Sequence, residues 1–363
     1  MSRFVMFTAL ILGMSLFSSS PAQDSSPLEI GSLTNKALAF LATRQAADGS
    51  FSAQAGPAVT ALVTTSILQH GRTADDPLVA KSLKYLTGFV REDGGIYSEG
   101  SVYKNYETSV ALMCFAAANK SGKYDQLLKK AEAFAKGLQW DEGEEKSKAD
   151  PEFGGAGYGK SKRPDLSNTS FFLDALKAVG NDENSEAIQR ALVFVSRCQN
   201  LESEHNATPF AAKNPDGGFY YTPAGGGQSQ AGNTETGGLR SYASMTYAGL
   251  KSMVYAGLTP DDLRVKAATE WVKKNYDLKS NPGMGDAGLY YYYNTVAKAL
   301  STMKMAELVD AQGKKHNWRQ ELIAELKSRQ QADGSWVNAN PKWMEGDPNI
   351  VTAYALLTLA NCK

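Results

Sequence analysis

The chain has 363 residues, of which 42% are hydrophobic and 21% are charged, so it holds enough apolar material for a large globular core. Lysine plus arginine and aspartate plus glutamate each number 38, and this balance leaves no long-range field to steer the protein to DNA, RNA or an acidic membrane surface. Nucleic acid is therefore excluded as an expected partner.

The first predicted element is an export signal over residues 1–22. Arg3 supplies a short positive region, residues 4–17 form an apolar run, and Ser20-Pro21-Ala22 places small residues where a signal peptidase cleaves. The run is short for a membrane span. We expect an exported protein, periplasmic or extracellular, with no stable membrane span after cleavage; an uncleaved anchor is the alternative.

Six pairs of helices are expected after a short linker at residues 23–31, in a single domain over residues 32–363. The first helix of each pair is amphipathic, with apolar residues at helical spacing and charged residues on its other face. The clearest examples are Leu33, Ala37, Leu38 and Leu41, then Leu83, Leu86 and Val90, and then Leu322, Ile323 and Leu326. The second helix is apolar nearly all round, over residues 58–68, 110–118, 171–179, 245–256, 290–306 and 350–360.

A Gly-rich aromatic turn separates the two helices of each pair. Gln45-Ala46-Ala47-Asp48-Gly49-Ser50-Phe51 returns near the end as Gln330-Gln331-Ala332-Asp333-Gly334-Ser335-Trp336, and four weaker copies lie between them. Glycine after aspartate can adopt a left-handed conformation that ends the first helix. The glutamine amide can bond to free backbone groups of the turn while the aromatic ring packs over it. We interpret these positions as structural staples.

A helix without a polar face needs cover on all sides, which predicts that the six apolar helices lie inside and the six amphipathic helices outside. Closed as a ring, this arrangement is an all-α fold, an (α/α)6 toroid. An open solenoid is the alternative, although its ends would normally carry polar capping repeats, and the terminal pairs here are among the most regular. The three longest connections, over residues 140–164, 200–235 and 276–286, precede apolar helices and should cluster at one mouth of the ring.

The turns, the helix pairing and the count of six resemble the squalene–hopene cyclase and protein prenyltransferase β-subunit superfamily, over about Ser32 to Lys363. The resemblance implies the toroid, whereas activities within the superfamily differ. Its cyclases start from Asp-x-Asp-Asp-Thr-Ala at the head of an inner helix, where the central carboxyl protonates an alkene. The nearest stretch here is Asp165-Leu166-Ser167-Asn168-Thr169-Ser170. Asp165 matches the first aspartate, but Ser167 and Asn168 replace the acid and its neighbour, and neither can protonate an alkene.

Signatures of the other branches of the superfamily do not match the sequence either. The Asp-x-Cys pair of the zinc prenyltransferases does not occur, and His70, His205 and His316 share no ligand spacing. The Asp-Asp-x-x-Asp motif for magnesium and diphosphate and the Gly-Cys-Gly-Glu-Gln thioester sequence are missing too. We therefore expect no metal and no cofactor. The odd, sparse set of Cys114, Cys198 and Cys362 predicts buried thiols, or one disulfide plus a spare thiol.

Candidate site residues lie near the heads of the inner helices, where they would face the mouth. The candidate catalytic carboxyls are Asp165, Glu107, Glu235 and Asp286, with N-terminal capping as the structural alternative for each. The candidate ligand-binding residues are Tyr106, Arg240, Tyr242, Tyr291, Tyr292, Trp343 and Asp347. A tyrosine-lined cavity suits an isoprenoid, another hydrophobic small molecule or the face of a sugar, unless the tyrosines only fill the core.

Three functions follow as hypotheses. The first is an exported toroid that binds a ligand or a protein partner through its mouth, without ordinary cyclase or prenyltransferase activity. The second is a divergent enzyme acting on an isoprenoid lipid, with Asp165 as the surviving acid and tyrosine faces stabilising cations. The third is a carbohydrate-active hydrolase or lyase that uses Glu107, Glu235 and Asp286.

Overall fold

The computed structural model describes residues 26–159 and 163–363, so the predicted export signal lies outside the described residues. The described helices alternate along the chain between an outer and an inner layer. The outer helices are α1 (Ser26–Arg44), α3 (Pro77–Thr87), α5 (Asp125–Lys136), α7 (Glu186–Arg197), α9 (Leu263–Asn275) and α11 (Trp318–Arg329). The inner helices are α2 (Pro57–Gln69), α4 (Lys104–Ala118), α6 (Leu166–Ala178), α8 (Ala243–Tyr255), α10 (Leu289–Thr302) and α12 (Pro348–Asn361).

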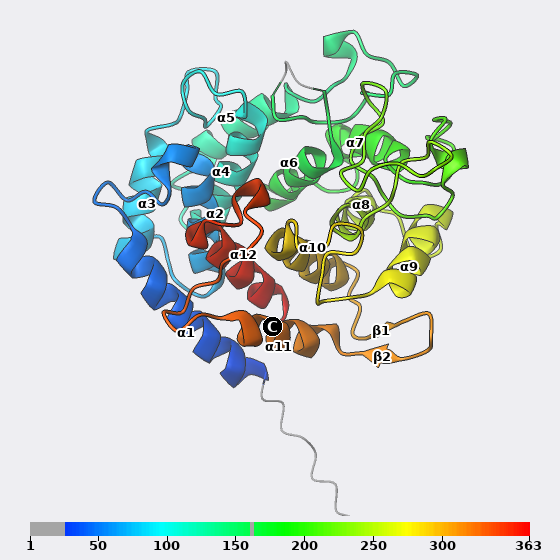
Figure 1. The fold of residues 1–363 in the computed structure, drawn as a ribbon. Helices are drawn as coiled ribbons and strands as arrows, with labels where there is room; N and C mark the ends of the chain where they lie inside the picture. Colours follow the sequence, from blue (N-terminus) through cyan, green and yellow to red (C-terminus); the bar gives the residue numbers. More distant parts are fainter. Residues whose placement is uncertain (1–25, 160–162) are drawn as a thin grey trace, which may run out of the picture.

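The inner helices form a closed ring. Each contacts the inner helices before and after it in the sequence, and α12 contacts both α10 and α2. The first outer helix, α1, packs against α11 and α12. Figure 1 shows the inner helices grouped about the centre, with the outer helices around them. The predicted all-α toroid of six pairs is therefore confirmed, and the open solenoid is wrong.

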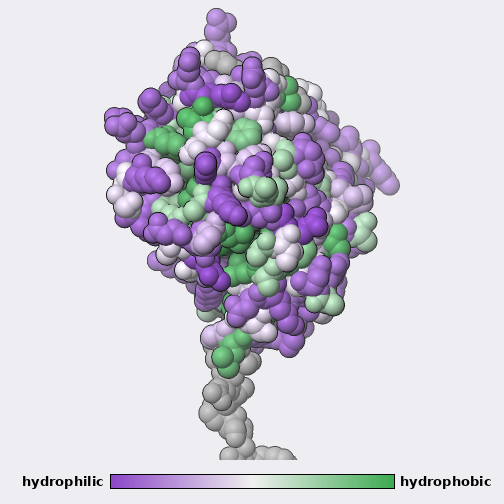
Figure 2. Space-filling model, turned by 90° about the vertical axis from the view of Figure 1, so that its left-hand side faces the viewer, coloured by the Kyte–Doolittle hydropathy of each residue, from purple (hydrophilic) through white to green (hydrophobic). Residues whose placement is uncertain are grey.

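Burial follows the two helix classes that the sequence pattern distinguishes. Every residue from Pro57 to Ile67 is buried in α2, and every residue from Asn349 to Leu359 is buried in α12. In the outer helix α5 the buried residues are Ala131 and Ala135 alone. The face of the molecule on the α1 and α3 side is accordingly mostly hydrophilic (Figure 2). The apolar helices lie inside because they have no polar face to offer to water.

The glutamine of the repeated turns joins one outer helix to the next. Gln45 Nε2 donates to the carbonyl oxygen of Gly49 in its own turn, at 3.3 Å, and to that of Leu78 in α3, at 2.7 Å. The corresponding glutamines also donate to a carbonyl oxygen of their own turn and to one of the next outer helix: Gln139 to α7, Gln199 to α9 and Gln330 to α1. The last turn thus ties the end of the ring to its beginning.

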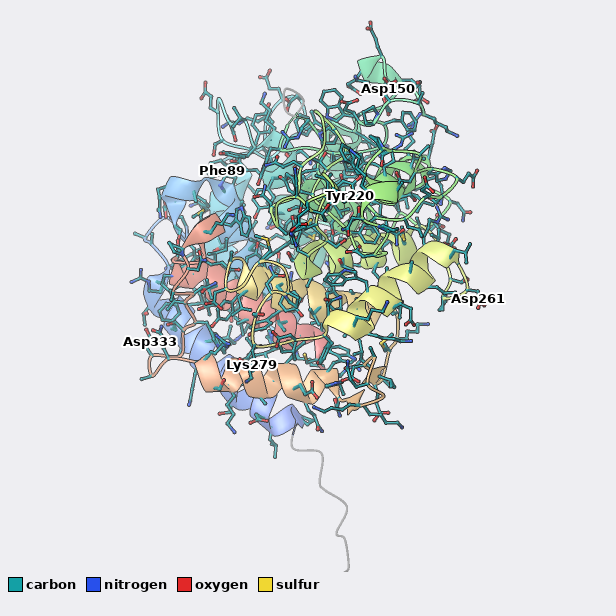
Figure 3. The ribbon with its side chains drawn as sticks, turned by 45° about the vertical axis from the view of Figure 1, so that its right-hand side comes forward. Phe89, Asp150, Tyr220, Asp261, Lys279 and Asp333 are labelled. Carbon is teal, nitrogen blue, oxygen red and sulfur yellow. The ribbon has the colours of Figure 1, made fainter. Side chains whose placement is uncertain are left out.

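The last turn also shows why glycine and an aromatic residue recur there. Gly334 has a φ of +91°, and a Cβ atom at this position would lie 2.4 Å from the carbonyl oxygen of Lys36 in α1. Trp336 is fully buried, and its Nε1 donates to the carbonyl oxygen of Leu326 at 2.8 Å. Asp333 of the same turn lies at the edge of the molecule in Figure 3. These contacts agree with the interpretation of the turns as structural staples.

Some details differ from the sequence-based expectations. Helix α1 begins at Ser26, so residues 26–31 are helical rather than a linker; Glu29 in its first turn complements the helix dipole. Helix α10 ends at Thr302, because Lys304 takes a left-handed φ of +54°. An antiparallel hairpin, β1 (Leu308–Val309) with β2 (Lys315–His316), then leads to α11.

Two further features of the described chain concern its cysteines and its helices. All three cysteines are buried and free, so the alternative of one disulfide is wrong. No helix among the described residues combines the length and the apolar character that crossing a bilayer requires.

Candidate functional site: the cavity at the mouth of the ring

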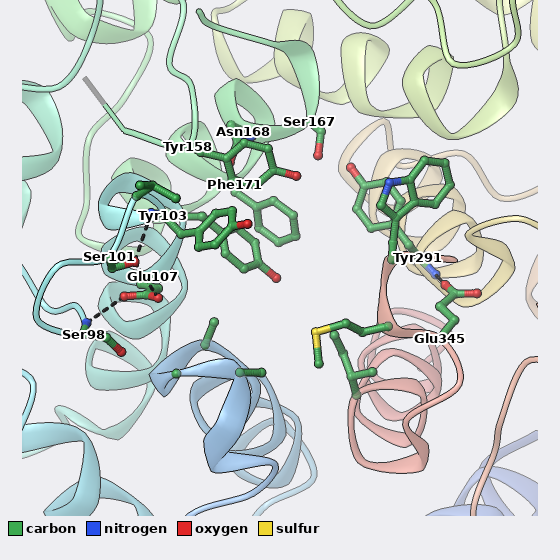
Figure 4. Close-up of a pocket in the computed structure, with 18 of the residues that line it drawn as sticks. Ser98, Ser101, Tyr103, Glu107, Tyr158, Ser167, Asn168, Phe171, Tyr291 and Glu345 are labelled. Atoms are coloured by element: carbon green, nitrogen blue, oxygen red, sulfur yellow. Dashed lines mark hydrogen bonds between the residues drawn. The ribbon is translucent and has the colours of Figure 1, made fainter. Parts of the chain in front are cut away.

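A cavity of about 690 Å³ opens at the end of the ring where the inner helices begin. All six inner helices line it with residues from their first two turns, among them Ala58 of α2, Ser244 of α8 and Ile350 of α12. Loop residues 98–103 and 343–345 complete its rim, as Figure 4 shows in part. We call this space the mouth cavity. It lies where the sequence predicted polar groups and tyrosines to gather.

Aromatic rings make up much of the wall of the mouth cavity. The ring centroid of Phe171 lies 5.2 Å from that of Tyr106 and 6.0 Å from that of Tyr291. The ring of Tyr354 lies 5.9 Å from Tyr291 on the other side. The aromatic residues that line the cavity are Tyr103, Tyr106, Tyr158, Phe171, Tyr221, Tyr242, Tyr291, Trp343 and Tyr354. They offer extended apolar faces with hydroxyl groups at their edges.

Glu107, in the first turn of α4, brings a buried carboxyl to this wall. Its Oε2 accepts the backbone N–H of Ser98 at 2.8 Å, and its Oε1 accepts the hydroxyl of Ser101 at 3.0 Å (Figure 4). A Cβ at Gly56, whose φ is +74°, would lie 2.9 Å from Oε1, so glycine leaves room for the carboxyl. Burial raises the pKa of Glu107 above its ordinary value, although the bonds from Ser98 and Ser101 oppose this. Glu107, a candidate catalytic carboxyl from the sequence, thus faces the mouth.

Asp165 occupies a different position, although it begins the neighbouring inner helix. Its Oδ1 accepts the backbone N–H of Asn168 at 2.9 Å, and its Oδ2 accepts the Asn168 side-chain amide at 2.7 Å. It is 2% exposed and does not line the mouth cavity, whereas Ser167 and Asn168 do. Burial raises the pKa of Asp165 to about 6. A hydrogen bond with the side chain of Tyr221, which lines the wall, links Asp165 to the cavity.

Glu345 is a site residue that sequence reasoning missed. It is 1% exposed and lines the mouth cavity, and its Oε1 accepts the backbone N–H of Tyr291 at 2.8 Å. Its Oε2 accepts the side-chain amide of Asn338 at 2.7 Å. Helix α10 has Gly288 as its N-cap, without a side chain to cap it, so Glu345 supplies the missing acceptor from a distant loop. Burial raises the pKa of Glu345 above its ordinary value.

The loop that carries Glu345 also covers part of the rim. Trp343 and Met344 have φ values of +55° and +66°, which is left-handed backbone that non-glycine residues rarely adopt. Both line the cavity, and they are 44% and 40% exposed. The Trp343 ring lies against Gly288, where a Cβ would approach it to 3.0 Å. Trp343, a candidate ligand-binding residue from the sequence, thus borders the cavity.

Several predicted site residues lie elsewhere. Glu235 and Asp286 are exposed and do not line the mouth cavity, because α8 begins only at Ala243 and α10 only at Leu289. The set of converging carboxyls expected for a carbohydrate-active enzyme is therefore not formed by these residues. Arg240 lines a separate polar cleft of about 410 Å³, with Asp216, Ser241 and Trp271.

Two more of the predicted ligand-binding residues have structural roles. Asp347 caps α12, accepting the backbone N–H of Asn349 at 2.8 Å, and does not line the cavity. Tyr292 is fully buried, and its hydroxyl donates to the carbonyl oxygen of Asp277 at 2.7 Å. Tyr106, Tyr242 and Tyr291 do line the mouth cavity, as predicted.

A buried ion cluster joins three inner helices below the first turns. Lys251 Nζ of α8 lies 2.7 Å from Asp174 Oδ2 of α6, and Lys298 Nζ of α10 lies 3.0 Å from Asp174 Oδ1. Burial lowers the pKa of Lys251 to about 8, although Asp174 opposes this. None of the three lines the mouth cavity. The described residues also contain no group of three His, Cys, Asp or Glu side chains arranged to hold a metal ion.

With this geometry in hand, comparison with known proteins identifies the relatives of the chain. Residues 34–222 match the family described as the squalene-hopene cyclase C-terminal domain. The chain belongs to this squalene-hopene cyclase family. No curated protein sequence matches it.

Solved structures with the same fold include type II terpene cyclases. An Asp-to-Ala variant of MstE from Scytonema, in complex with the product merosterolic acid A, is 16% identical with a TM-score of 0.55; the match covers 93% of this chain and 97% of that one. An Arg-to-Ala variant of MstE in complex with the substrate geranylgeranyl dihydroxybenzoate is 14% identical with a TM-score of 0.55, covering 93% and 98%. At these identities the likeness concerns the fold of this squalene-hopene cyclase family member.

Proposed function

We propose that this protein binds an isoprenoid or another largely hydrophobic small molecule in the mouth cavity, without the proton donor of ordinary cyclases. The observation that carries the proposal is the cavity itself, about 690 Å³ walled by aromatic rings together with Met245 and Ile350. Such a surface removes hydrocarbon from water. The complexes of MstE with a geranylgeranyl substrate and with merosterolic acid A support the same class of ligand by analogy of fold.

The head of α6 supports binding rather than ordinary cyclisation. Ser167 and Asn168 face the cavity at the positions of the acid and its neighbour, and neither side chain can protonate an alkene. The carboxyl of Asp165 is turned toward the start of its own helix. An exported location belongs to the same proposal and rests on the signal-like residues 1–22.

The test compares a substitution that fills the mouth cavity with the same substitution outside the cavity. Ala58 lines the mouth cavity, whereas Ala80 is exposed on the outer helix α3. Isothermal titration calorimetry with farnesol should show binding to the wild type and to Ala80→Phe. Binding to Ala58→Phe should be at least about tenfold weaker, because the added ring occupies the space of the ligand. Thermal unfolding monitors whether both variants fold. Equal affinity of the two variants, or no binding by the wild type, would refute the proposal.

A second candidate is a divergent enzyme acting on an isoprenoid. It is favoured by Asp165, whose pKa is raised to about 6 and whose carboxyl meets the Tyr221 side chain at the cavity wall. Incubating the wild type and Asp165→Asn with farnesol and geranylgeraniol, followed by mass spectrometry of the extracted lipids, distinguishes the two. A product made by the wild type and not by the variant supports the enzyme; identical lipid profiles leave binding as the function.

A further inference from the structure

The charged side chains that line the mouth cavity all carry the same sign. Glu99, Glu107 and Glu345 contribute carboxyls, and the described residues of the lining include no lysine, arginine or histidine. Glu107 and Glu345 are 4% and 1% exposed, so their carboxyls are shielded from bulk water. A carboxylate in such a place attracts a positive charge more strongly than one at the surface.

The aromatic wall also attracts positive charge. The face of an aromatic ring is the negative end of its quadrupole, and a cation within about 6 Å of a ring centre is attracted to it. Phe171 meets Tyr291 in a stacked arrangement, and Tyr291 meets Tyr354 edge to face, so neighbouring rings differ in direction around the cavity. Several rings of this kind, grouped around one space, are the arrangement that binds alkylammonium groups.

An unpartnered acceptor points to the same chemistry. Asn168 is 1% exposed and lines the mouth cavity. Its Nδ2 donates to Asp165, but its Oδ1 is buried without a hydrogen-bond partner among the described residues. A buried carbonyl oxygen in this state favours a ligand that offers a donor or a positive charge.

Positive charge near the mouth opposes this pattern in part. The inner helices point their N-terminal ends at the mouth, which would favour an anion. Asp165, Glu345 and Asp347 accept N–H groups at the starts of α6, α10 and α12, whereas α2, α4 and α8 begin without a side-chain cap. Lys251 and Lys298 pair with Asp174 and do not line the cavity. Arg91 attracts the Glu107 carboxyl but does not line the cavity either. Glu107 lies in the first turn of α4 and complements the dipole of that helix, but its hydrogen bonds come from loop donors and not from the N–H groups of α4.

We propose that the ligand of the mouth cavity is an amphiphilic organic cation, a hydrocarbon that carries an alkylammonium group held by Glu107 and the surrounding aromatic faces. This inference rests on the proposed binding function and adds the charge of the ligand to it. Its hydrocarbon part would lie along Phe171, Met245 and Ile350, which line the same cavity.

The experiment compares three probes that share one acyclic C10 isoprenoid skeleton. These are geranyltrimethylammonium, its neutral isostere with a tert-butyl group in place of the trimethylammonium group, and geranate, each titrated into the full chain by calorimetry at pH 7. The cation should bind at least about tenfold more tightly than the neutral isostere, and geranate should bind more weakly than either.

Two matched pairs of variants locate the effect. Glu107→Gln should weaken binding of the cation at least about fivefold and change binding of the neutral isostere less than about twofold. Glu92→Gln, which removes the same charge from an exposed position outside the cavity, should change neither. Tyr354→Phe should keep the preference for the cation because the ring face remains, whereas Tyr354→Leu should reduce it.

The outcomes separate this inference from the function on which it rests. Binding of the neutral isostere as tightly as the cation overturns the inference and leaves the hydrophobic site intact. Tighter binding of geranate overturns it in favour of an anionic ligand. If farnesol and all three probes fail to bind to the folded wild type, the binding function and the inference both fall.

Discussion

The heads of α4 and α6 carry one buried carboxyl each, yet the two groups do different work. Asp165 accepts hydrogen bonds from Asn168 with both oxygens at the start of its own helix, and only its hydrogen bond with Tyr221 links it to the cavity wall. Glu107 is held by Ser98 and Ser101, residues of the preceding loop, and this loop turns it toward the mouth cavity. The origin of its hydrogen-bond donors therefore decides whether the carboxyl at each of these helix heads faces its own helix or the cavity. Helix position alone does not decide it.

The largest effect that tests this comparison is the pH dependence contributed by Asp165. Burial raises its pKa from the ordinary value of 3.8 to about 6 in the folded protein, so folding favours the protonated form. The stabilisation is complete below pH 3.8 and is lost as pH rises through about 6. The free energy of unfolding should fall by about 3 kcal/mol over this interval through this group alone. Urea unfolding at several pH values should show the fall in the wild type and a smaller one in Asp165→Asn. Parallel profiles would contradict the assignment.

The next effect concerns Glu345, which both lines the cavity and caps α10. Glu345→Ala should lower the free energy of unfolding by about 2 kcal/mol, because the first N–H groups of α10 lose their acceptor in a buried place. Glu99→Ala, at the exposed rim, should change it by less than about 0.5 kcal/mol. Urea unfolding at pH 7 measures both. A negligible loss in Glu345→Ala would mean that the loop is not tied to α10 by this carboxyl.

A smaller effect is expected when the helix-serving carboxyl is changed and ligand binding is measured. Asp165→Asn should alter the affinity for the neutral isostere by less than about twofold, or about 0.4 kcal/mol, because the group does not line the cavity. Calorimetry on the folded variant gives the value. A tenfold loss of affinity would show that Asp165 contributes to binding, and the two helix heads would then not differ in this respect.

The smallest effect belongs to the exposed carboxyls outside the cavity. Glu235→Gln and Asp286→Asn should leave both stability and the affinity for the cationic probe unchanged, within about 0.3 kcal/mol, because water screens these groups. Calorimetry and urea unfolding check the pair together. A clear loss of affinity in either variant would show that the cavity extends beyond its present walls.

The fold was predictable because the sequence features that determine it are local and recur along the chain. Amphipathic and apolar helices alternate, and a glutamine and an aromatic residue mark each strong turn, so two layers follow from patterning alone. The closed ring was preferred to an open solenoid because the terminal pairs are as regular as the others. The site was predictable where a residue lies within a recognisable inner helix. Glu107, Tyr106 and Tyr291 were found in this way.

The rest of the site depended on features that no pattern marks. Glu345 lies in an irregular loop and caps a helix far away in the sequence, so only the tertiary structure reveals it. Glu235 and Asp286 were placed at helix heads that begin several residues later. Among the four consecutive tyrosines, the pattern required some to face inward, but only packing decides which. Tyr291 lines the cavity, while Tyr292 and Tyr293 bond to the carbonyls of Asp277 and Leu278.

The bond from Gln330 to α1 has a consequence for the order of the chain. Gln45 makes the same contact between α1 and α3, two outer helices that the chain connects covalently through α2. No such covalent connection exists between α12 and α1. The junction between α12 and α1 is thus held by the interactions that hold the others, although no peptide bond crosses it. Circular permutation should accordingly be tolerated: the ends could be joined and the chain reopened at the exposed residues 182–184 between α6 and α7. The fold depends on the contacts between neighbouring helix pairs, so the first residue of the chain can be placed at another position in the ring.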